Sequence, residues 1–364
     1  MKKYILIASA ALLSLAACTK VQNAADTQQE VSFQVANYVQ TKADAAPVAF
    51  TGEDFGTYAW HHDADVSVFM ENEQVGLKGG EWKPLAHTFF WPKTGAINFI
   101  SYAPFAQTGG PAVTENSIAY SAYTVSDQDV MYADRAQNQT ANTETYFYNG
   151  VPTLFHHALA KLSFRAKANF TEYTDPANGS KTTWEVTLQK ATLKGLYNTG
   201  DLKLDLAADG KAWQTEGWKP DTKKTMEDVV LYDAEKGLVL GTTPSDLYTD
   251  KDGKAQSFFV LPQALAAGAQ QLTLKIHIKT TQPNKDAAGN NIVQEEDYEA
   301  TFDLKDVSSL AAWGMNQNIT YTICIKPTDA VDPSNPDSPA DVVITFDPSL
   351  LDWEVVDADA YIQL

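Results

Sequence analysis

The stretch Leu272-Thr273-Leu274-Lys275-Ile276-His277-Ile278 alternates apolar and polar side chains along its whole length. Because successive side chains of a β-strand point to opposite faces, this alternation predicts a strand with one buried face. Similar short segments recur along the chain, separated by clusters of Gly, Asn, Asp and Pro. The clearest are residues 66–69, 97–102, 161–165, 184–188, 258–261 and 319–325. With few helix signals between them, they predict an all-β protein of stacked antiparallel sheets.

The composition is acidic and provides ample material for large cores. The chain has 364 residues with 8 Trp, 16 Tyr and 16 Phe, enough for two domains of ordinary size. Its formal net charge is −19, and Arg135 and Arg165 are its only arginines. Such a surface repels phosphate backbones, so we expect no nucleic-acid partner. A polar loop pattern at residues 134–145 places the predicted domain boundary between residues 43–150 and 151–328.

The N-terminus has the pattern of an export signal. Lys2 and Lys3 precede an apolar run over residues 4–15, which is shorter than the roughly 20 residues of a spanning helix. The run ends in Leu15-Ala16-Ala17-Cys18, which resembles the lipobox of bacterial lipoproteins. We therefore predict a signal peptide over residues 1–17 and a lipid on the Cys18 thiol. No later run is long enough to span a bilayer.

The second cysteine, Cys324, has no partner if Cys18 is acylated. Cys324 alternates in phase with Thr320 and Thr322, so we interpret it as a small strand residue and not as a nucleophile. Stability is then expected to come from packing and not from disulfides.

Two terminal segments have the alternation of half-buried strands. The first carries Val31, Phe33, Val35 and Val39 on one face. The second follows a linker rich in proline and acid at residues 329–339, within a C-terminal segment predicted over residues 329–364. A β-sandwich that lacks one strand exposes an apolar groove, and either segment suits such a groove by β-augmentation. The apolar residues of the second segment are Val356, Ala358, Ala360, Ile362 and Leu364.

Candidate metal and catalytic sites are weak. The pairs His61-His62 and His156-His157 consist of neighbours that point to opposite faces of a strand, so both seldom ligate one ion. The Asp-rich segment 246–253 lacks the terminal Glu and flanking helices of a calcium loop and predicts a turn. Nucleophile elbows, phosphate loops and His-Glu-x-x-His motifs are missing from the sequence. We therefore expect no metal, no cofactor and no enzymatic activity.

An ordered set of motifs resembles one known family over nearly the whole chain. The motifs are Leu15-Ala-Ala-Cys18, Phe89-Phe-Trp-Pro92, Ile97-Asn-Phe-Ile-Ser-Tyr-Ala-Pro104, Asp129-Val-Met-Tyr-Ala133, Phe155-His-His-Ala-Leu-Ala-Lys-Leu-Ser-Phe164, Leu193-Lys-Gly-Leu-Tyr-Asn-Thr-Gly200, Phe258-Phe-Val-Leu-Pro-Gln263 and Ile344-Thr-Phe-Asp-Pro348 with Trp353. This order is similar to the fimbrillin family, the pilins and pilin-like lipoproteins of Bacteroidales pili.

The resemblance implies two transthyretin-like β-sandwich domains and export as a lipoprotein to the cell outer membrane. It further implies proteolytic removal of an N-terminal strand, then strand exchange with other pilus subunits in a cell-surface fimbria that serves adhesion. The C-terminal strand is the expected donor. A host or bacterial surface ligand is a further candidate partner.

Removal of the first strand requires a cut in the chain. Lys20 and Lys42 are the only basic residues between Cys18 and Lys78, so a Lys/Arg-specific protease has one sensible target. We predict cleavage between Lys42 and Ala43, which makes residues 18–42 a propeptide. Family pilins are generally cut after arginine, and none stands here, so a second interpretation of Lys42 as a linker residue stays open.

A second hypothesis is a glycan-binding surface lipoprotein, or a tip or anchor subunit, that does not polymerise. Aromatic rings on a surface can stack against sugars, whereas the same rings in a sandwich core have a structural role. The tryptophans considered for such a platform are Trp60, Trp82, Trp91, Trp213, Trp218 and Trp313.

Overall fold

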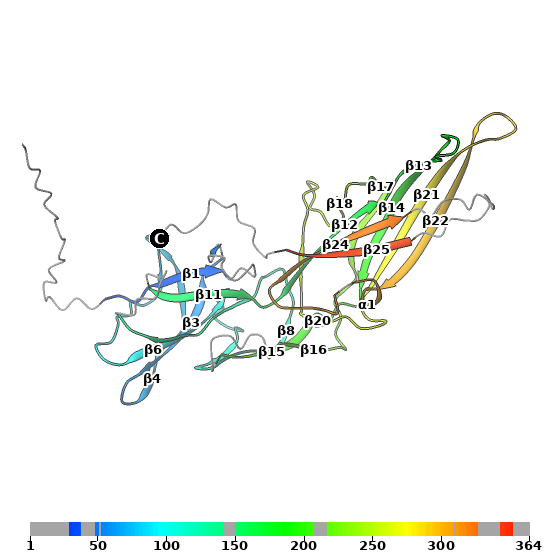
Figure 1. Ribbon diagram of the computed structural model, residues 1–364. Coiled ribbons are helices and arrows are strands. Elements are labelled where there is room, and N and C mark those ends of the chain that lie inside the picture. The colour runs from blue at the N-terminus through cyan, green and yellow to red at the C-terminus, as the bar shows by residue number, and fades with distance from the viewer. Residues whose placement is uncertain are drawn as a thin grey trace, which may run out of the picture.

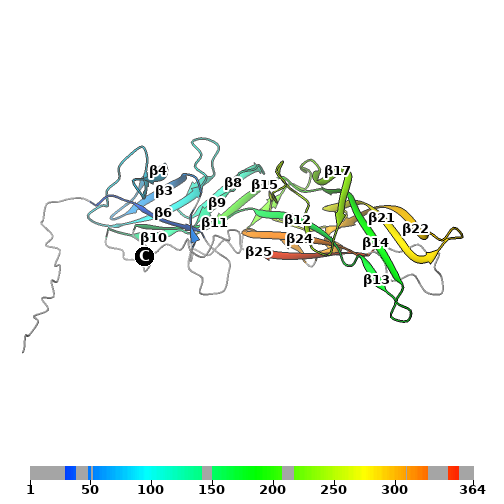
Figure 2. The same ribbon diagram turned by 90° about the horizontal axis from the view of Figure 1, so that it is seen from above.

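The computed structural model describes residues 29–37, 48–50, 52–141, 150–206, 217–308, 310–326 and 343–351. Their regular structure is almost entirely β, which confirms the predicted all-β class. In this part of the chain the single helix is α1 (Leu304–Val307), and no helix there has the length and apolar character to cross a bilayer. Figures 1 and 2 show an elongated molecule with β1, β3, β4 and β6 towards one end and β13, β14, β21 and β22 towards the other.

The N-terminal end is one nine-stranded sheet in the order β10-β6-β3-β4-β5-β1-β11-β9, with β2 paired to β1. It closes on itself, because β6 also pairs with β9. Its first core cluster gathers side chains from these strands on the inner face. The strands are β1 (Phe33–Asn37), β2 (Val48–Ala49), β3 (Phe55–His62), β4 (Val66–Lys78), β5 (Glu81–Pro84), β6 (Ala96–Ala103), β9 (Met131–Ala133), β10 (Ala136–Gln139) and β11 (Val151–His157).

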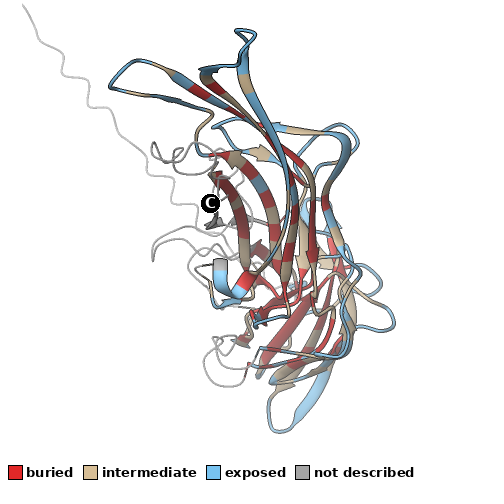
Figure 3. Cartoon of the chain, turned by 90° about the vertical axis from the view of Figure 1, so that its right-hand side faces the viewer, coloured by how far each residue is buried: buried red, intermediate tan, exposed pale blue. Residues whose placement is uncertain are grey.

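The C-terminal end has two five-stranded sheets that share one core cluster. Apolar side chains alternate along the strands, so buried and exposed residues alternate in Figure 3. The first sheet holds β12 (Ala160–Ala168), β18 (Ser245–Asp246), β19 (Phe258–Val260), β24 (Gln317–Lys326) and β25 (Val343–Leu351). The second holds β13 (Glu172–Thr174), β14 (Lys181–Lys194), β17 (Val229–Leu240), β21 (Gln271–Lys285) and β22 (Asn291–Asp303). A separate pair is β20 (Gln263–Ala264) with β23 (Ala312–Trp313).

The two ends are joined by a four-stranded sheet to which both halves of the sequence contribute. It contains β7 (Ala112–Thr114), β8 (Ser117–Thr124), β15 (Thr199–Asp205) and β16 (Trp218–Pro220), and β8 pairs with β15. Figures 1 and 2 show β8 and β15 midway along the molecule. A third core cluster combines Ile100 and Tyr132 from the N-terminal half with Leu202, Leu204 and Leu261 from the C-terminal half.

Two aspects of this architecture differ in detail from the sequence prediction. We placed the domain boundary at residue 150, whereas β11 still belongs to the N-terminal sheet and the change of sheet falls after His157. Among the described strands, pairing is antiparallel except for β1–β11 and β12–β24. Parallel neighbours need long crossover connections, and more than a hundred residues separate each of these pairs in sequence.

Candidate functional site

Strand β1 occupies the interior of the N-terminal sheet, and the apolar residues predicted for it face the core. Val31, Phe33 and Val35 are 1%, 3% and 4% exposed, whereas Ser32 and Gln34 between them are only half-buried. This is the alternation read from the sequence. Burial of each apolar side chain contributes roughly 1.5–3 kcal/mol, so these three residues hold the segment firmly.

Aromatic rings surround Phe33 in the core. Its ring centroid lies 5.5 Å from that of Phe55 and 5.7 Å from that of Phe99, with both pairs edge to face. Such contacts stabilise a core beyond the area they bury. We call β1 together with this wall the β1 site. The wall residues are Phe50, Phe55, Trp82, Phe99 and Phe155.

The backbone of β1 is paired unequally on its two sides. Residues Phe33 to Asn37 pair in parallel with Val151 to Phe155 of β11, five residues in all. On the other side β1 meets two residues of β2 and only Trp82 of β5. Loss of β1 would therefore expose a continuous row of backbone groups on β11, which is a template for another strand.

The residues just before β1 are also held by backbone hydrogen bonds. The Val31 amide donates to the Phe89 carbonyl at 2.9 Å, and the Trp91 amide donates to the Gln29 carbonyl at 2.9 Å. These bonds connect the segment to the Phe-Phe-Trp-Pro motif. The segment from Gln29 to Asn37 is thus continuously paired.

The turn into β11 approaches β1 closely and requires glycine. Gly150 has a φ of +128°, and a Cβ there would lie 2.7 Å from the carbonyl oxygen of Ser32. Only glycine adopts this backbone conformation at low cost, and only its hydrogen fits against the Ser32 carbonyl. The neighbouring Val151 amide donates to the same carbonyl at 2.8 Å.

An exposed ion pair lies at the start of the site. The Lys83 ammonium is 2.6 Å from the Glu81 carboxylate and 3.2 Å from the Glu30 carboxylate. Hydrogen bonds from these two carboxylates, that of Glu81 first, raise the pKa of Lys83 above its ordinary value. Lys83 is positively charged at neutral pH and links β5 to the segment before β1. Exposed pairs of this kind contribute little to stability, so apolar burial dominates the retention of β1.

The structure brings together only part of the predicted site. Val31, Phe33 and Val35 share one core face, as predicted, whereas the other proposed residues lie outside the described part of the chain. The aromatic wall was missed, although Phe99 and Phe155 stand in motifs quoted from the sequence. The order of strands that places them around Phe33 has no local signature. The residues outside the described part are Cys18, Val39, Lys42, Ala43, Val356, Ala358, Ala360, Ile362 and Leu364.

The candidate histidines each bind a separate partner. His61 and His62 contact the Thr94 carbonyl and the Glu115 carboxylate, and the buried His156 and His157 contact two aspartates. The buried pairs are His156 Nε2 with Asp134 at 2.9 Å and His157 Nδ1 with Asp129 at 2.6 Å. Within the described residues, no three metal-ligating side chains gather in one place.

The candidate tryptophans that the structure describes do not form the exposed platform considered for sugars. Trp91, Trp218 and Trp313 are buried, and Trp60 and Trp82 are half-buried. The indole N–H groups of Trp218 and Trp313 donate to the Ala158 carbonyl at 2.6 Å and to the Tyr321 hydroxyl at 2.9 Å. These rings have structural roles, and Trp213 lies outside the described residues.

Cys324 lies in β24, as expected of a strand residue, and is only 8% exposed. The face that it shares with Thr320 is also buried, whereas its sequence neighbours suggested a polar surface. Thr320 satisfies its hydroxyl through Ser163 of β12 at 2.8 Å. Thr320 and Cys324 are therefore buried despite the polar alternation, and the Thr320 hydroxyl is satisfied within the sheet.

Comparisons with known proteins give one matching family and similar solved structures. The family model described as Fimbrillin-like matches residues 41–353. A fimbrial protein structure from Bacteroides vulgatus matches with a TM-score of 0.54 and 16% identity, over 89% of this chain and 99% of the other. A Bacteroides uniformis structure assigned to cell adhesion matches with a TM-score of 0.43 and 17% identity, over 91% of this chain and 99% of the other. No curated protein matches the chain.

Proposed function

Because the chain belongs to the fimbrillin-like family, we propose that it is a subunit of a cell-surface fimbria that polymerises by strand exchange. Membership confirms the resemblance seen in the sequence motifs, and a fimbrial and adhesive role follows from it. The observation that carries the finer proposal is the β1 site. A terminal strand there fills an aromatic core with three side chains and is joined to the following strand through the connection that contains Lys42.

Maturation begins with export and lipid attachment at Cys18, which delivers the precursor to the outer membrane. A Lys/Arg-specific protease then cuts between Lys42 and Ala43, after which β1 is held by noncovalent contacts alone. When β1 leaves with the lipid, the apolar wall and the backbone edge of β11 become free. The lipid anchor is in this account a delivery step and not a permanent attachment.

The donor strand comes from the C-terminus of the next subunit. Val356, Ala358, Ala360, Ile362 and Leu364 alternate in the same way as Val31, Phe33 and Val35. An added strand gains main-chain hydrogen bonds along β11, and its alternate side chains enter the pockets that β1 vacates. The likeness of the two patterns supports replacement of one segment by the other.

The test combines a blocked cut with a matched control. Lys42→Gln removes the only basic residue near the end of β1, and Lys20→Gln removes the other basic residue of the propeptide. We expect cells with Lys42→Gln to carry a monomeric lipoprotein that starts at Cys18, and cells with Lys20→Gln to form fibres. N-terminal sequencing and electron microscopy of surface material measure both outcomes.

Deletion of residues 356–364 tests the donor separately. The deleted chain should be cut at Lys42 and remain monomeric. Fibres formed by this deletion variant would exclude the C-terminal donor. A wild-type surface protein that still begins at Cys18 would instead favour the role of an anchor or of a non-polymerising surface lipoprotein.

A further inference from the structure

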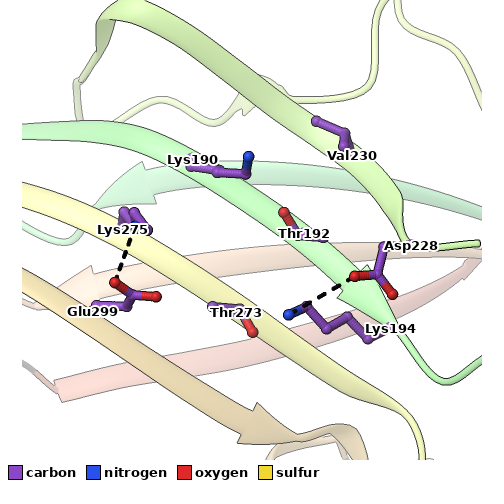
Figure 4. Close-up of a pocket in the computed structure, with 8 residues that line it drawn as sticks. All are labelled: Lys190, Thr192, Lys194, Asp228, Val230, Thr273, Lys275 and Glu299. Atoms are coloured by element: carbon purple, nitrogen blue, oxygen red, sulfur yellow. Dashed lines mark ion pairs between the residues drawn. The ribbon is translucent and has the colours of Figure 1, made fainter.

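The outer face of the second C-terminal sheet carries a pocket far from the β1 site. The pocket measures about 350 Å³ and lies over β14, β21 and the start of β17 (Figure 4). This volume is at the small end of the roughly 300–1,000 Å³ of ligand sites. The carboxylates of Asp228 and Glu299 line it beside three lysines, in a chain whose net charge is −19. The lysines are Lys190, Lys194 and Lys275.

Two of these lysines are direct cross-strand neighbours. Lys190 of β14 stands opposite Lys275 of β21, and like charges in such a pair are unfavourable. Each has a carboxylate only on its outer side, Asp233 at 2.6 Å and Glu299 at 3.0 Å. The row therefore reads acid, base, base, acid, and each ammonium group is paired with the carboxylate on its outer side. An anion between the two lysines would relieve their repulsion.

The floor of the pocket contains a buried hydroxyl that lacks a partner. Thr192 is 6% exposed, and its hydroxyl makes no hydrogen bond within the described part of the chain. It stands between Val230 of β17 and Thr273 of β21 in adjacent strands. A buried hydroxyl without a partner is unfavourable unless a ligand or water satisfies it. Its position in the pocket floor makes a ligand oxygen a suitable partner.

We propose that this pocket binds an acidic saccharide, with the ligand carboxylate placed between Lys190 and Lys275. The Thr192 hydroxyl donates to a ligand oxygen, the exposed methyls of Val230 contact the C–H face of the sugar ring, and Lys194 contacts the ring hydroxyls. The existing ion pairs are exposed and weak, so the ligand carboxylate competes with them readily. Ammonium, hydroxyl and apolar groups in one small pocket favour a polyhydroxylated anion over an extended peptide.

The site adds a ligand to the adhesive role and does not depend on strand exchange. The experiment therefore uses the full, unpolymerised chain and measures binding by calorimetry. The probes are sialyllactose and digalacturonate, which separate sialic acids from polyuronates, with lactose as the neutral control. We expect millimolar or tighter binding of at least one acidic probe, weaker binding in salt, and none of lactose.

Two substitutions and one matched control test the assignment. Thr192→Val keeps the shape and removes the unpartnered hydroxyl, so it should preserve or increase the melting temperature while binding weakens about tenfold. Lys275→Gln should weaken binding at least as much. Lys279→Gln removes an equally exposed, paired lysine on the same strand outside the pocket and should leave binding unchanged.

Several outcomes would overturn the proposal. One is the absence of binding of both acidic probes at millimolar concentration. Another is binding that Thr192→Val and Lys275→Gln leave unchanged. A peptide copied from the acidic residues 329–339 is the competing occupant, and binding of that peptide without the saccharides would reassign the pocket to contacts between subunits.

Discussion

At the scale of single residues, Phe33 inserts the aromatic side chain of β1 into the core. Its ring is edge to face with two phenylalanines from β3 and β6. The adjacent Gln34 points to the other face and is half-buried. Within this strand, Phe33 therefore packs in the core, whereas the side chain of the neighbouring Gln34 lies on the opposite face.

Phe33→Ala should destabilise the uncut precursor by about 3–5 kcal/mol, because it leaves a cavity among aromatic rings. Gln34→Ala is the matched control and should cost under about 1 kcal/mol. Denaturant unfolding of the purified precursor measures both. Fibres made after removal of β1 should be equally stable with either variant, and a loss of fibre stability in Phe33→Ala would contradict the departure of β1.

Tyr132 lies in the third core cluster, at the junction between the two ends of the molecule. It is 2% exposed and stacks on His156, and burial raises the pKa of its hydroxyl well above the ordinary value. Above about pH 10 the unfolded chain loses this proton and the folded chain keeps it. Alkaline pH therefore stabilises the unfolded state, and stability is lost as the pH rises through that range.

Tyr132→Phe should reduce this alkaline loss of stability by up to about 1.4 kcal/mol per pH unit. Other buried tyrosines have raised pKa values too, so the loss becomes shallower and does not vanish. Tyr173→Phe, at an exposed position, is the control. Equal slopes for the two variants in unfolding curves between neutral and alkaline pH would refute the role of Tyr132.

At the scale of elements, β1 pairs along its whole length with β11 on one side and over only a few residues with β2 and β5 on the other. Under the proposed strand exchange, its five-residue parallel match with β11 is the interaction that an incoming strand would have to replace. Ala36 of β1 stands opposite Leu154 of β11, and Ala36 is buried whereas Leu154 is half-buried. Neighbouring strands lie about 4.7–4.9 Å apart, which suits a disulfide between such positions.

A disulfide between Ala36→Cys and Leu154→Cys should lock β1 in place. The oxidised protein, even when cut at Lys42, is expected to keep β1 and remain monomeric. Reduction should release β1 and allow fibres to grow. The oxidised and reduced states of one preparation are therefore compared with each other. Light scattering before and after reduction measures the change, and polymerisation of the oxidised sample would rule out exchange at β1.

At the scale of the whole molecule, the two ends are coupled through β8, β15 and the third core cluster. Leu204 of β15 is fully buried there and pairs with Ile118 of β8. Large apolar contact between domains favours a single rigid unit over two independent ones. Such a unit suits a subunit that transmits tension along a fibre.

The full chain should therefore unfold in one calorimetric transition, with equal calorimetric and van't Hoff enthalpies. Leu204→Ala should destabilise the whole transition by about 2–5 kcal/mol, because the cavity lies between the halves. Val239→Ala, at an exposed position, should change little. Two separate transitions in the wild-type protein would show that the halves are independent.

By itself, the sequence determined the all-β class and the inner face of individual strands, including Val31, Phe33 and Val35. Alternation is a property of neighbouring residues, so it is readable without knowledge of the partners. The family motifs likewise lie within short segments.

Only the tertiary structure decided which strands meet. The parallel pairing of β1 with β11, the aromatic wall around Phe33, the burial of the tryptophans and the opposition of Lys190 to Lys275 all join distant segments. Strand pairing is selected by the combined packing of many residues that are far apart in sequence, and no local pattern encodes it.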